Sequence, residues 1–203
     1  WKFHWVRNAS ERPSGIGAVD YDDAAWGSMP VPGMWELNGY GDPVYVNIGY
    51  AWRGNFRNDP PYVPDAENHV GSYRRTFDIP ASWGGKDIFL SIGSATSNVY
   101  VWVNGRFVGY SEDSKLAAQF DITKFVTPGS DNLIVMRVNR WCDGSFLEDQ
   151  DFWRFAGIAR GVELTARDKA HLEDVRITPV LDSEYKDATL RVEVETTPRV
   201  KSV

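Results

Sequence analysis

The side chains that could do chemistry are densest near residue 150, where four carboxylates and one amide fall within nine positions. The run reads Asp143-Gly144-Ser145-Phe146-Leu147-Glu148-Asp149-Gln150-Asp151-Phe152-Trp153-Arg154. Carboxylate and amide oxygens hydrogen-bond to sugar hydroxyls, and as hard ligands they also suit a cation. An arbitrary acidic run is more often a solvated loop. The interleaved aromatic residues favour a built site, because a solvated loop has no use for so much apolar area.

A catalytic role for these acids is a separate question. Hydrolysis of a glycosidic bond needs two carboxyl groups held about 5–10 Å apart across the bond. A run of acids in sequence does not establish that geometry, so we predict no catalytic residue in this chain. The alternating ligands of an EF-hand are missing as well, as are a P-loop and the G-x-S-x-G nucleophile motif.

Cysteine and histidine do not indicate a metal centre. Cys142 is the single cysteine, which excludes an internal disulfide and a cysteine zinc site. The histidines His4, His69 and His171 lie far apart without metal-ligand spacing, so we expect each on the surface or in packing.

Composition and charge limit the possible partners. Trp, Tyr and Phe make up 14% of the 203 residues, which suits a sandwich core and also stacking on sugars. Trp35, Trp52 and Trp102 could stack in this way, but we expect them to be buried. A net charge of −6 argues against nucleic acid and anionic membrane surfaces, which attract clustered cations. The chain lacks an initiator Met and a domain-closing end, so we expect a piece of a longer protein.

The chain divides into two parts that differ in composition and in the alternation of apolar and polar residues. Residues 1–70 are rich in Gly, Pro and aromatics, which predicts a long wrapping segment without regular ladders. From Ser72 onward apolar and polar residues alternate as in half-buried strands, at 73–79, 87–92, 132–138 and 161–166. Short strands separated by frequent turns favour an all-β fold, an antiparallel β-sandwich.

The clearest local signal is a tight hairpin. Residues 99–103 and 106–110 flank Asn104-Gly105, a pair that tolerates the two positive φ angles of a type I′ turn. Residues 120–126 are interpreted as a short helical turn with Asp121 as its N-cap. Residues 172–180 and 188–194 alternate again and predict the first strands of a second, immunoglobulin-like domain.

The acidic run, with its Trp and Arg behind it, resembles the amino-terminal sugar-binding domain of family 2 glycoside hydrolases, and more narrowly that of the large bacterial β-galactosidases. Further segments fall in the family's order: Val31-Pro32-Gly33-Met34-Trp35, Pro43-Val44-Tyr45-Val46-Asn47, Pro60-Pro61-Tyr62-Val63-Pro64 and Val103-Asn104-Gly105-Arg106-Phe107-Val108-Gly109-Tyr110-Ser111. The resemblance implies a galactose-binding-like jelly roll over residues 1–168 and the start of an immunoglobulin-like domain over residues 169–203.

In that family the jelly roll stands over a (β/α)₈ barrel that carries both catalytic glutamates, and the resemblance implies that this barrel is missing from the chain. Asn47 and Asp151 are then expected to contact a β-galactoside, and Asp151 to share a sodium ion with the barrel. Asp149, Trp153 and Arg154 would support the loop. The resemblance also implies a magnesium ion in the barrel, a homo-oligomeric parent enzyme, and a bacterial cytoplasmic or periplasmic location.

Three features depart from the family pattern. Ala159 stands where an aromatic residue is common, residues 49–59 form a longer stretch than usual, and residues 65–70 are atypical. The last two leave the subunit contacts and the preference for the second sugar open. Two alternatives therefore stand beside the non-catalytic domain of a retaining β-galactosidase. One is a self-sufficient carbohydrate-binding module, and the other is the same domain of a β-glucuronidase or β-mannosidase.

Overall fold

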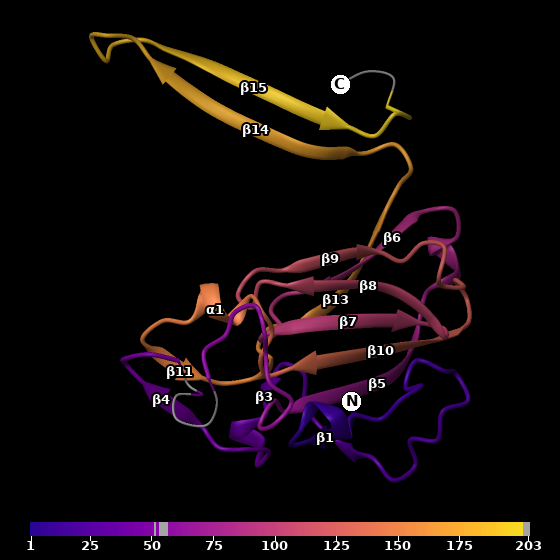
Figure 1. Cartoon of the computed structure of the whole chain (residues 1–203). Helices are drawn as coiled ribbons and strands as arrows, with labels where there is room; N and C mark the ends of the chain where they lie inside the picture. The colour runs from indigo at the N-terminus through magenta and orange to yellow at the C-terminus, as the bar shows by residue number, and fades with distance from the viewer. Residues whose placement is uncertain (51, 53–56, 201–203) are drawn as a thin grey trace.

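Antiparallel strands dominate the computed structural model, which describes residues 1–50, 52 and 57–200 (Figure 1). One sheet has the order β2-β1-β5-β10-β7-β8 and another the order β13-β6-β9. The strands of the six-stranded sheet are β2 (Gly27–Ser28), β1 (Lys2–Val6), β5 (Val70–Asp78), β10 (Asp131–Asn139), β7 (Asn98–Val103) and β8 (Arg106–Glu112). Those of the three-stranded sheet are β13 (Val162–Arg167), β6 (Asp87–Ile92) and β9 (Ala118–Asp121). The predicted all-β, antiparallel architecture is confirmed.

The two sheets share one apolar core because alternate residues of a strand point to the same side. Every second residue of β6 is buried, and in β7 Val101 and Val103 are fully buried while Tyr100 and Trp102 face the other way. The turn between β7 and β8 has φ angles of 48° at Asn104 and 81° at Gly105, as the predicted type I′ hairpin requires. The predicted strands are thus confirmed in position, and β6 and β7 also show the expected alternation of buried and less buried side chains. β5 does not, because its first five residues are all buried.

The expectation that residues 1–70 form no regular ladder is wrong for the start of the chain. β1 lies inside the six-stranded sheet, between β2 and β5, with Phe3 opposite Tyr73. Phe3 is buried in the core, while the neighbouring His4 stacks on Trp26. Aromatic residues on both faces of the strand hide the alternation that would have identified it.

The helical turn expected at residues 120–126 is also wrong in its first part. Phe120 and Asp121 end β9, where they pair with Leu90 and Phe89 of β6. Asp121 does cap a local turn, because its Oδ1 accepts a hydrogen bond of 2.9 Å from the amide of Thr123. A short acidic side chain stabilises such a turn without any helix, and this explains the misreading.

Smaller elements complete the structure. β3 (Gly33–Met34) pairs with β12 (Gly157–Ile158), and β4 (Val44–Val46) pairs with β11 (Phe152–Arg154). The helices are short: the 3₁₀ turns η1 (Ala9–Glu11), η2 (Glu36–Asn38) and η3 (Ala81–Trp83), and α1 (Ser145–Glu148). None of the helices in the described part of the chain is long and apolar enough to cross a bilayer.

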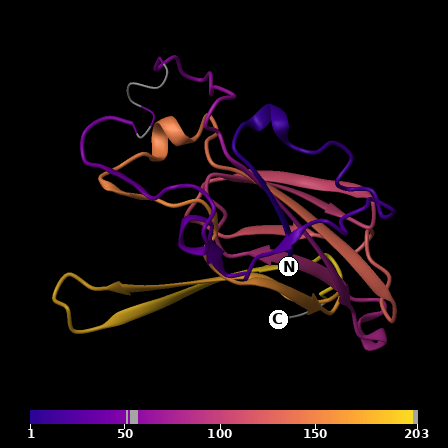
Figure 2. The same cartoon turned by 90° about the horizontal axis from the view of Figure 1, so that it is seen from below.

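The last two strands form a separate hairpin. β14 (Leu172–Leu181) and β15 (Ala188–Thr196) pair with one another and project away from the sandwich in both views (Figures 1 and 2). Almost every residue of both strands is exposed. The predicted strands at 172–180 and 188–194 are confirmed, and the immunoglobulin-like domain that they would begin stays a prediction.

Candidate functional site

The predicted site residues meet at the end of a small two-stranded arm formed by β4 and β11. The two strands lie side by side at one end of the sandwich (Figure 1), with Phe152 opposite Val46 and Trp153 opposite Tyr45. The next position along this register places Asp151 opposite Asn47. Residues 104 positions apart in the sequence are thereby brought to one place, and both are exposed.

Asp151 is held in position through one oxygen only. Its Oδ1 accepts a hydrogen bond of 2.7 Å from the phenol of Tyr45, which raises the pKa of Tyr45 because the acceptor is a carboxylate. Within the described residues Oδ2 has no hydrogen-bond donor, and neither does the amide oxygen of Asn47. A free carboxylate oxygen beside a free amide can receive sugar hydroxyls or contribute two ligands to a hard cation.

Arg154 fixes the arm from behind. Its side chain is 4% exposed and forms two parallel hydrogen bonds to Asp149, Nε to Oδ1 at 2.9 Å and Nη2 to Oδ2 at 3.1 Å. The same guanidinium donates to the carbonyls of Val46, Phe152 and Gln150, and so ties β4 to the loop that carries Asp151. Asp149 and Arg154 therefore have the geometry of the predicted support, while their effect on binding stays a prediction.

Trp153 faces outward from the arm. It is 53% exposed, stacks parallel to Phe155 at 5.8 Å between ring centroids, and leans on Tyr45 at 5.4 Å. Its contact with the loop is therefore indirect, through the tyrosine that holds Asp151. Trp35 and Trp52 are buried, as expected, and Trp102 is half-buried.

The acidic run does not behave as a solvated loop. Glu148 accepts from the hydroxyl and amide of Ser114, Asp149 pairs with Arg154, and Asp151 pairs with Tyr45. Only Asp143 among the four carboxylates is exposed without a side-chain hydrogen bond in the described structure. Three of the four acids are thus built into the structure.

The aromatic residues of the run support the same end of the molecule. Phe146 of α1 packs edge-on against Tyr50 at 5.3 Å and Trp52 at 5.1 Å, and these two rings stack on one another at 4.7 Å. The phenol of Tyr50 donates to the carbonyl of Phe146. The stretch at residues 49–59, which seemed longer than usual, therefore packs on the acidic run through Tyr50 and Trp52. Residues 51 and 53–56 lie outside the described residues.

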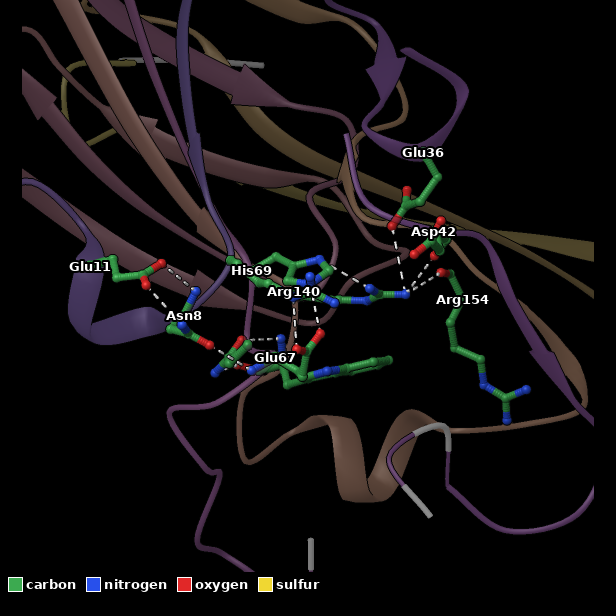
Figure 3. Close-up of polar contacts among 11 residues, drawn as sticks. Asn8, Glu11, Glu36, Asp42, Glu67, His69, Arg140 and Arg154 are labelled. Atoms are coloured by element: carbon green, nitrogen blue, oxygen red, sulfur yellow. Dashed lines mark hydrogen bonds and ion pairs between the residues drawn. The ribbon is translucent and has the colours of Figure 1, made fainter. Parts of the chain in front are cut away.

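A second buried arginine, Arg140, supports the arm at its base (Figure 3). Its Nη2 lies 3.2 Å from the carbonyl oxygen of Asp42, 3.5 Å from that of Arg154, and 3.8 Å from Oε1 of Glu36. Its Nη1 lies 3.0 Å from Nδ1 of His69, which accepts because an arginine can only donate. Arg140 thereby joins the chain before β4, the end of β11 and the start of β5.

Burial sets the protonation of this network. The Glu36 side chain is fully buried, which raises its pKa, although it accepts from the amide of Ala156 at 3.0 Å. Burial, together with the charge of Arg140, lowers the pKa of His69 from 6.5 to about 4. His69 is therefore neutral at pH 7. The expectation that His69 serves packing holds. Arg140 and Glu36 belong to no local sequence motif and were not predicted as part of the site.

Cation binding has one further geometric candidate, apart from the arm. One ligand atom each from Glu112, Cys142 and Asp143 lies within 4.8 Å of the others. Burial raises the pKa of Cys142 to about 11, so its thiol is protonated and a poor ligand at neutral pH. The free oxygens of Asp151 and Asn47 are harder ligands than a protonated thiol and lie on the surface.

Comparison with known proteins extends these observations. The sequence profile described as "Glycosyl hydrolases family 2, sugar binding domain" matches residues 1–168. A β-galactosidase of Priestia megaterium is 42% identical over 195 residues, which are 96% of this chain and 19% of the relative. A β-galactosidase of Lactobacillus delbrueckii subsp. bulgaricus is 39% identical over 193 residues, 95% of this chain and 19% of the relative. The chain thus spans about a fifth of the length of these relatives.

Solved structures show the same fold at lower identity. A β-glucuronidase of Bacteroides uniformis superposes with a TM-score of 0.72 at 23% identity, covering 96% of this chain and 21% of that chain. At a sequence identity of 23%, this similarity shows that the fold is shared.

Proposed function

The chain belongs to the sugar-binding domains of family 2 glycosyl hydrolases, and from this premise we propose that it supplies one side of the galactoside pocket of a larger retaining β-galactosidase. The catalytic carboxylates would come from a barrel outside this chain. The present chain would act by holding the terminal sugar.

One observation carries the proposal. The register of β4 and β11 brings Asn47 and Asp151 to adjacent positions, both exposed and both with free oxygens. Arg154 and Arg140 hold this pair from behind with contacts to backbone carbonyls on both strands. A site of this kind is preorganised, because its supporting side chains are buried and hydrogen-bonded before any ligand arrives.

The two site residues would perform different tasks. Asp151 keeps one oxygen on Tyr45, so the other can accept a hydrogen bond from a sugar hydroxyl with the strength of a charged acceptor. Asn47 both donates and accepts through its amide, which suits a hydroxyl that does the same. A sodium ion held partly by Asp151 would neutralise the carboxylate and orient a sugar hydroxyl. We expect the rest of its shell, a magnesium ion and the contacts of a homo-oligomer to lie elsewhere in the larger enzyme.

The choice of galactoside over glucuronide depends on sequence similarity. The relatives named β-galactosidase share 39–42% of their residues with this chain, whereas the Bacteroides uniformis β-glucuronidase shares 23%. A β-mannosidase or β-glucuronidase therefore remains the weaker alternative.

A second candidate function is a self-sufficient carbohydrate-binding module. The observation in its favour is the aromatic surface along the arm, where the exposed ring of Trp153 lies 5.4 Å from the exposed ring of Tyr45 and 5.8 Å from the half-buried ring of Phe155. Such rings can stack on a sugar without help from a barrel.

The test compares this chain with the larger enzyme. The chain alone should not hydrolyse a nitrophenyl β-galactoside, and galactose should bind it poorly, because two or three ligands form only part of the pocket. The larger enzyme should cleave the β-galactoside in preference to the β-glucuronide and the β-mannoside. Asp151→Asn should impair that cleavage and Asp143→Asn, in the same acidic run, should not. Preference for the glucuronide, or tight binding of galactose by the chain alone, would favour the respective alternative.

A further inference from the structure

The face of the six-stranded sheet that points away from the core carries two arginines with opposite surroundings. Arg74 of β5 lies opposite Val135 of β10, and Arg137 stands two positions further along β10, so both face the same side. Arg74 pairs with Asp23 at 2.9 Å and donates to the carbonyls of the loop that covers it. No carboxylate of the described residues pairs with Arg137.

Aromatic rings, rather than a carboxylate, surround the guanidinium of Arg137. The guanidinium lies over the ring of Tyr100, 4.0 Å from its centroid, and 5.7 Å from that of Trp102. Its Nε is buried and has no hydrogen-bond partner among the described residues. Burial lowers the pKa of Arg137, Tyr100 acts in the opposite direction, and the nearby cation Arg12 lowers the pKa further.

A hollow of about 580 Å³ opens beside this pair. The loop after η1 forms one wall and the sheet forms the floor, with Arg12, Ser14, Gly15, Gly17, Trp102 and Arg137 among the lining residues. Gly17 lies directly on the indole, because a Cβ there would be 2.7 Å from Cδ1 of Trp102. The hollow has the size of small-molecule sites, which span about 300–1,000 Å³.

We propose that this hollow binds an acidic monosaccharide, with the sugar carboxylate received by Arg137 and Arg12 and the sugar ring seated beside Trp102. A guanidinium presents its donors in a planar fork that matches a carboxylate, and the Nη1 and Nη2 groups of Arg137, which donate to no described residue, are suited to such a group. An aromatic wall and a hydroxyl at Ser14 suit the ring and its substituents. The site uses no residue of the β4–β11 arm and stands independently of the proposed galactoside pocket.

The experiment is a ¹H–¹⁵N NMR titration of the 203-residue chain with D-galacturonate, with D-galactose as the neutral probe and inorganic phosphate as the plain anion. Galacturonate should shift the Nε–H signal of Arg137, the indole N–H of Trp102 and the amides of Gly15 and Gly17, with saturation in the millimolar range. Arg137→Met and Arg12→Ala should each weaken binding at least ~10-fold, as expected for loss of a charged hydrogen bond. Arg12 is exposed, so its variant tests the site even where Arg137→Met alters the sheet.

Arg106→Met is the matched control, because Arg106 also lies over an aromatic ring, 4.6 Å from the centroid of Phe125, but outside the hollow. It should leave the affinity unchanged. Three results would overturn the proposal: no saturable shift with galacturonate, equal binding of galactose, or equal binding of phosphate without a response from Trp102. The last would mean an adventitious ion only.

Discussion

The β4–β11 arm and the β14–β15 hairpin are both two-stranded antiparallel sheets, yet they differ in what lies behind them. The arm is fastened by Arg154 and Arg140, whose guanidiniums donate to backbone carbonyls of its strands and loops. The described residues give the hairpin no comparable support: both of its faces are exposed, and Asp182 orders only its turn through hydrogen bonds from the amides of residues 184, 186 and 187. An isolated two-stranded sheet is marginally stable in water. Polar contacts to the backbone, rather than strand length, therefore make the shorter sheet a fixed platform.

The largest effect is expected from Arg154→Met. The change leaves the Asp149 carboxylate, 9% exposed, without its ion pair, and it removes three hydrogen bonds to carbonyls. Breaking a buried pair from one side costs about 3–5 kcal/mol of unfolding free energy. Urea unfolding followed by tryptophan fluorescence measures this. The control is Arg191→Met on the exposed hairpin, which should change stability by less than about 0.5 kcal/mol. Equal losses in the two variants would contradict the contrast between arm and hairpin.

A second effect concerns pH and the base of the arm. Burial lowers the pKa of folded His69 from 6.5 to about 4, so between these values the unfolded chain binds a proton that the folded chain does not. The stability that depends on neutral His69 is complete above pH 6.5 and is lost as the pH falls towards 4. The total is about 3 kcal/mol, since each pKa unit corresponds to about 1.4 kcal/mol.

The measurement is urea unfolding at several pH values between 4 and 7. His69→Asn keeps an acceptor near Arg140 but has no proton to gain, so its stability should fall less steeply over this interval. Parallel slopes for the two proteins would show that other groups control the acid response, such as Glu67, whose pKa is lowered by its hydrogen bond from Arg7.

The third prediction tests whether Asp151, which the β4–β11 arm holds in place, takes part in the galactoside pocket. In the larger enzyme, Asp151→Asn should lower kcat/KM by at least ~10²-fold, because one charge-assisted hydrogen bond and part of a cation site are lost together. A hydrogen bond to a charged group contributes about 1.5–3 kcal/mol, and each ~1.4 kcal/mol is a factor of ten. Steady-state kinetics with a nitrophenyl β-galactoside supply the numbers, with Asp143→Asn as the control. Unchanged kinetics for Asp151→Asn would remove Asp151 from the pocket.

Asn47→Ala should have a smaller effect, near ~10-fold in kcat/KM. A neutral amide contact is weaker than a charged one, and Asn47 supports no other described side chain. The same assay measures it. A loss as large as that of Asp151→Asn would show that the two oxygens act as one unit, through the cation.

Some elements of the fold and of the site could be predicted from the sequence, and others could not. The β7–β8 hairpin was predictable because Asn104 and Gly105 specify their own turn. β4 was not, since its three residues acquire their strand conformation from β11, more than a hundred positions away. The site residues came from resemblance to a family, and the geometry adds what resemblance did not: Tyr45 as the partner of Asp151.

The buried residues that support the arm could not be predicted from the sequence, for a related reason. Arg140 and Glu36 come from separate segments, and each looks in sequence like an ordinary charged residue beside an aromatic one. Their importance arises only where burial forces them to find partners. Long-range polar contacts of this kind have no period and no motif.

The smallest effect is expected in the β14–β15 hairpin. Ile177 of β14 is 60% exposed, so in this chain Ile177→Ala should change the unfolding free energy by less than about 0.5 kcal/mol. Ile92→Ala, at a fully buried position of β6, should cost about 2–5 kcal/mol and serves as the reference for the same chemical change. In the larger enzyme the hairpin would begin an immunoglobulin-like domain whose remaining strands cover it, and there Ile177→Ala should approach the cost of Ile92→Ala. If it stays near zero in the larger enzyme as well, residues 169–203 do not begin such a domain, and the hairpin is an exposed projection in its own right.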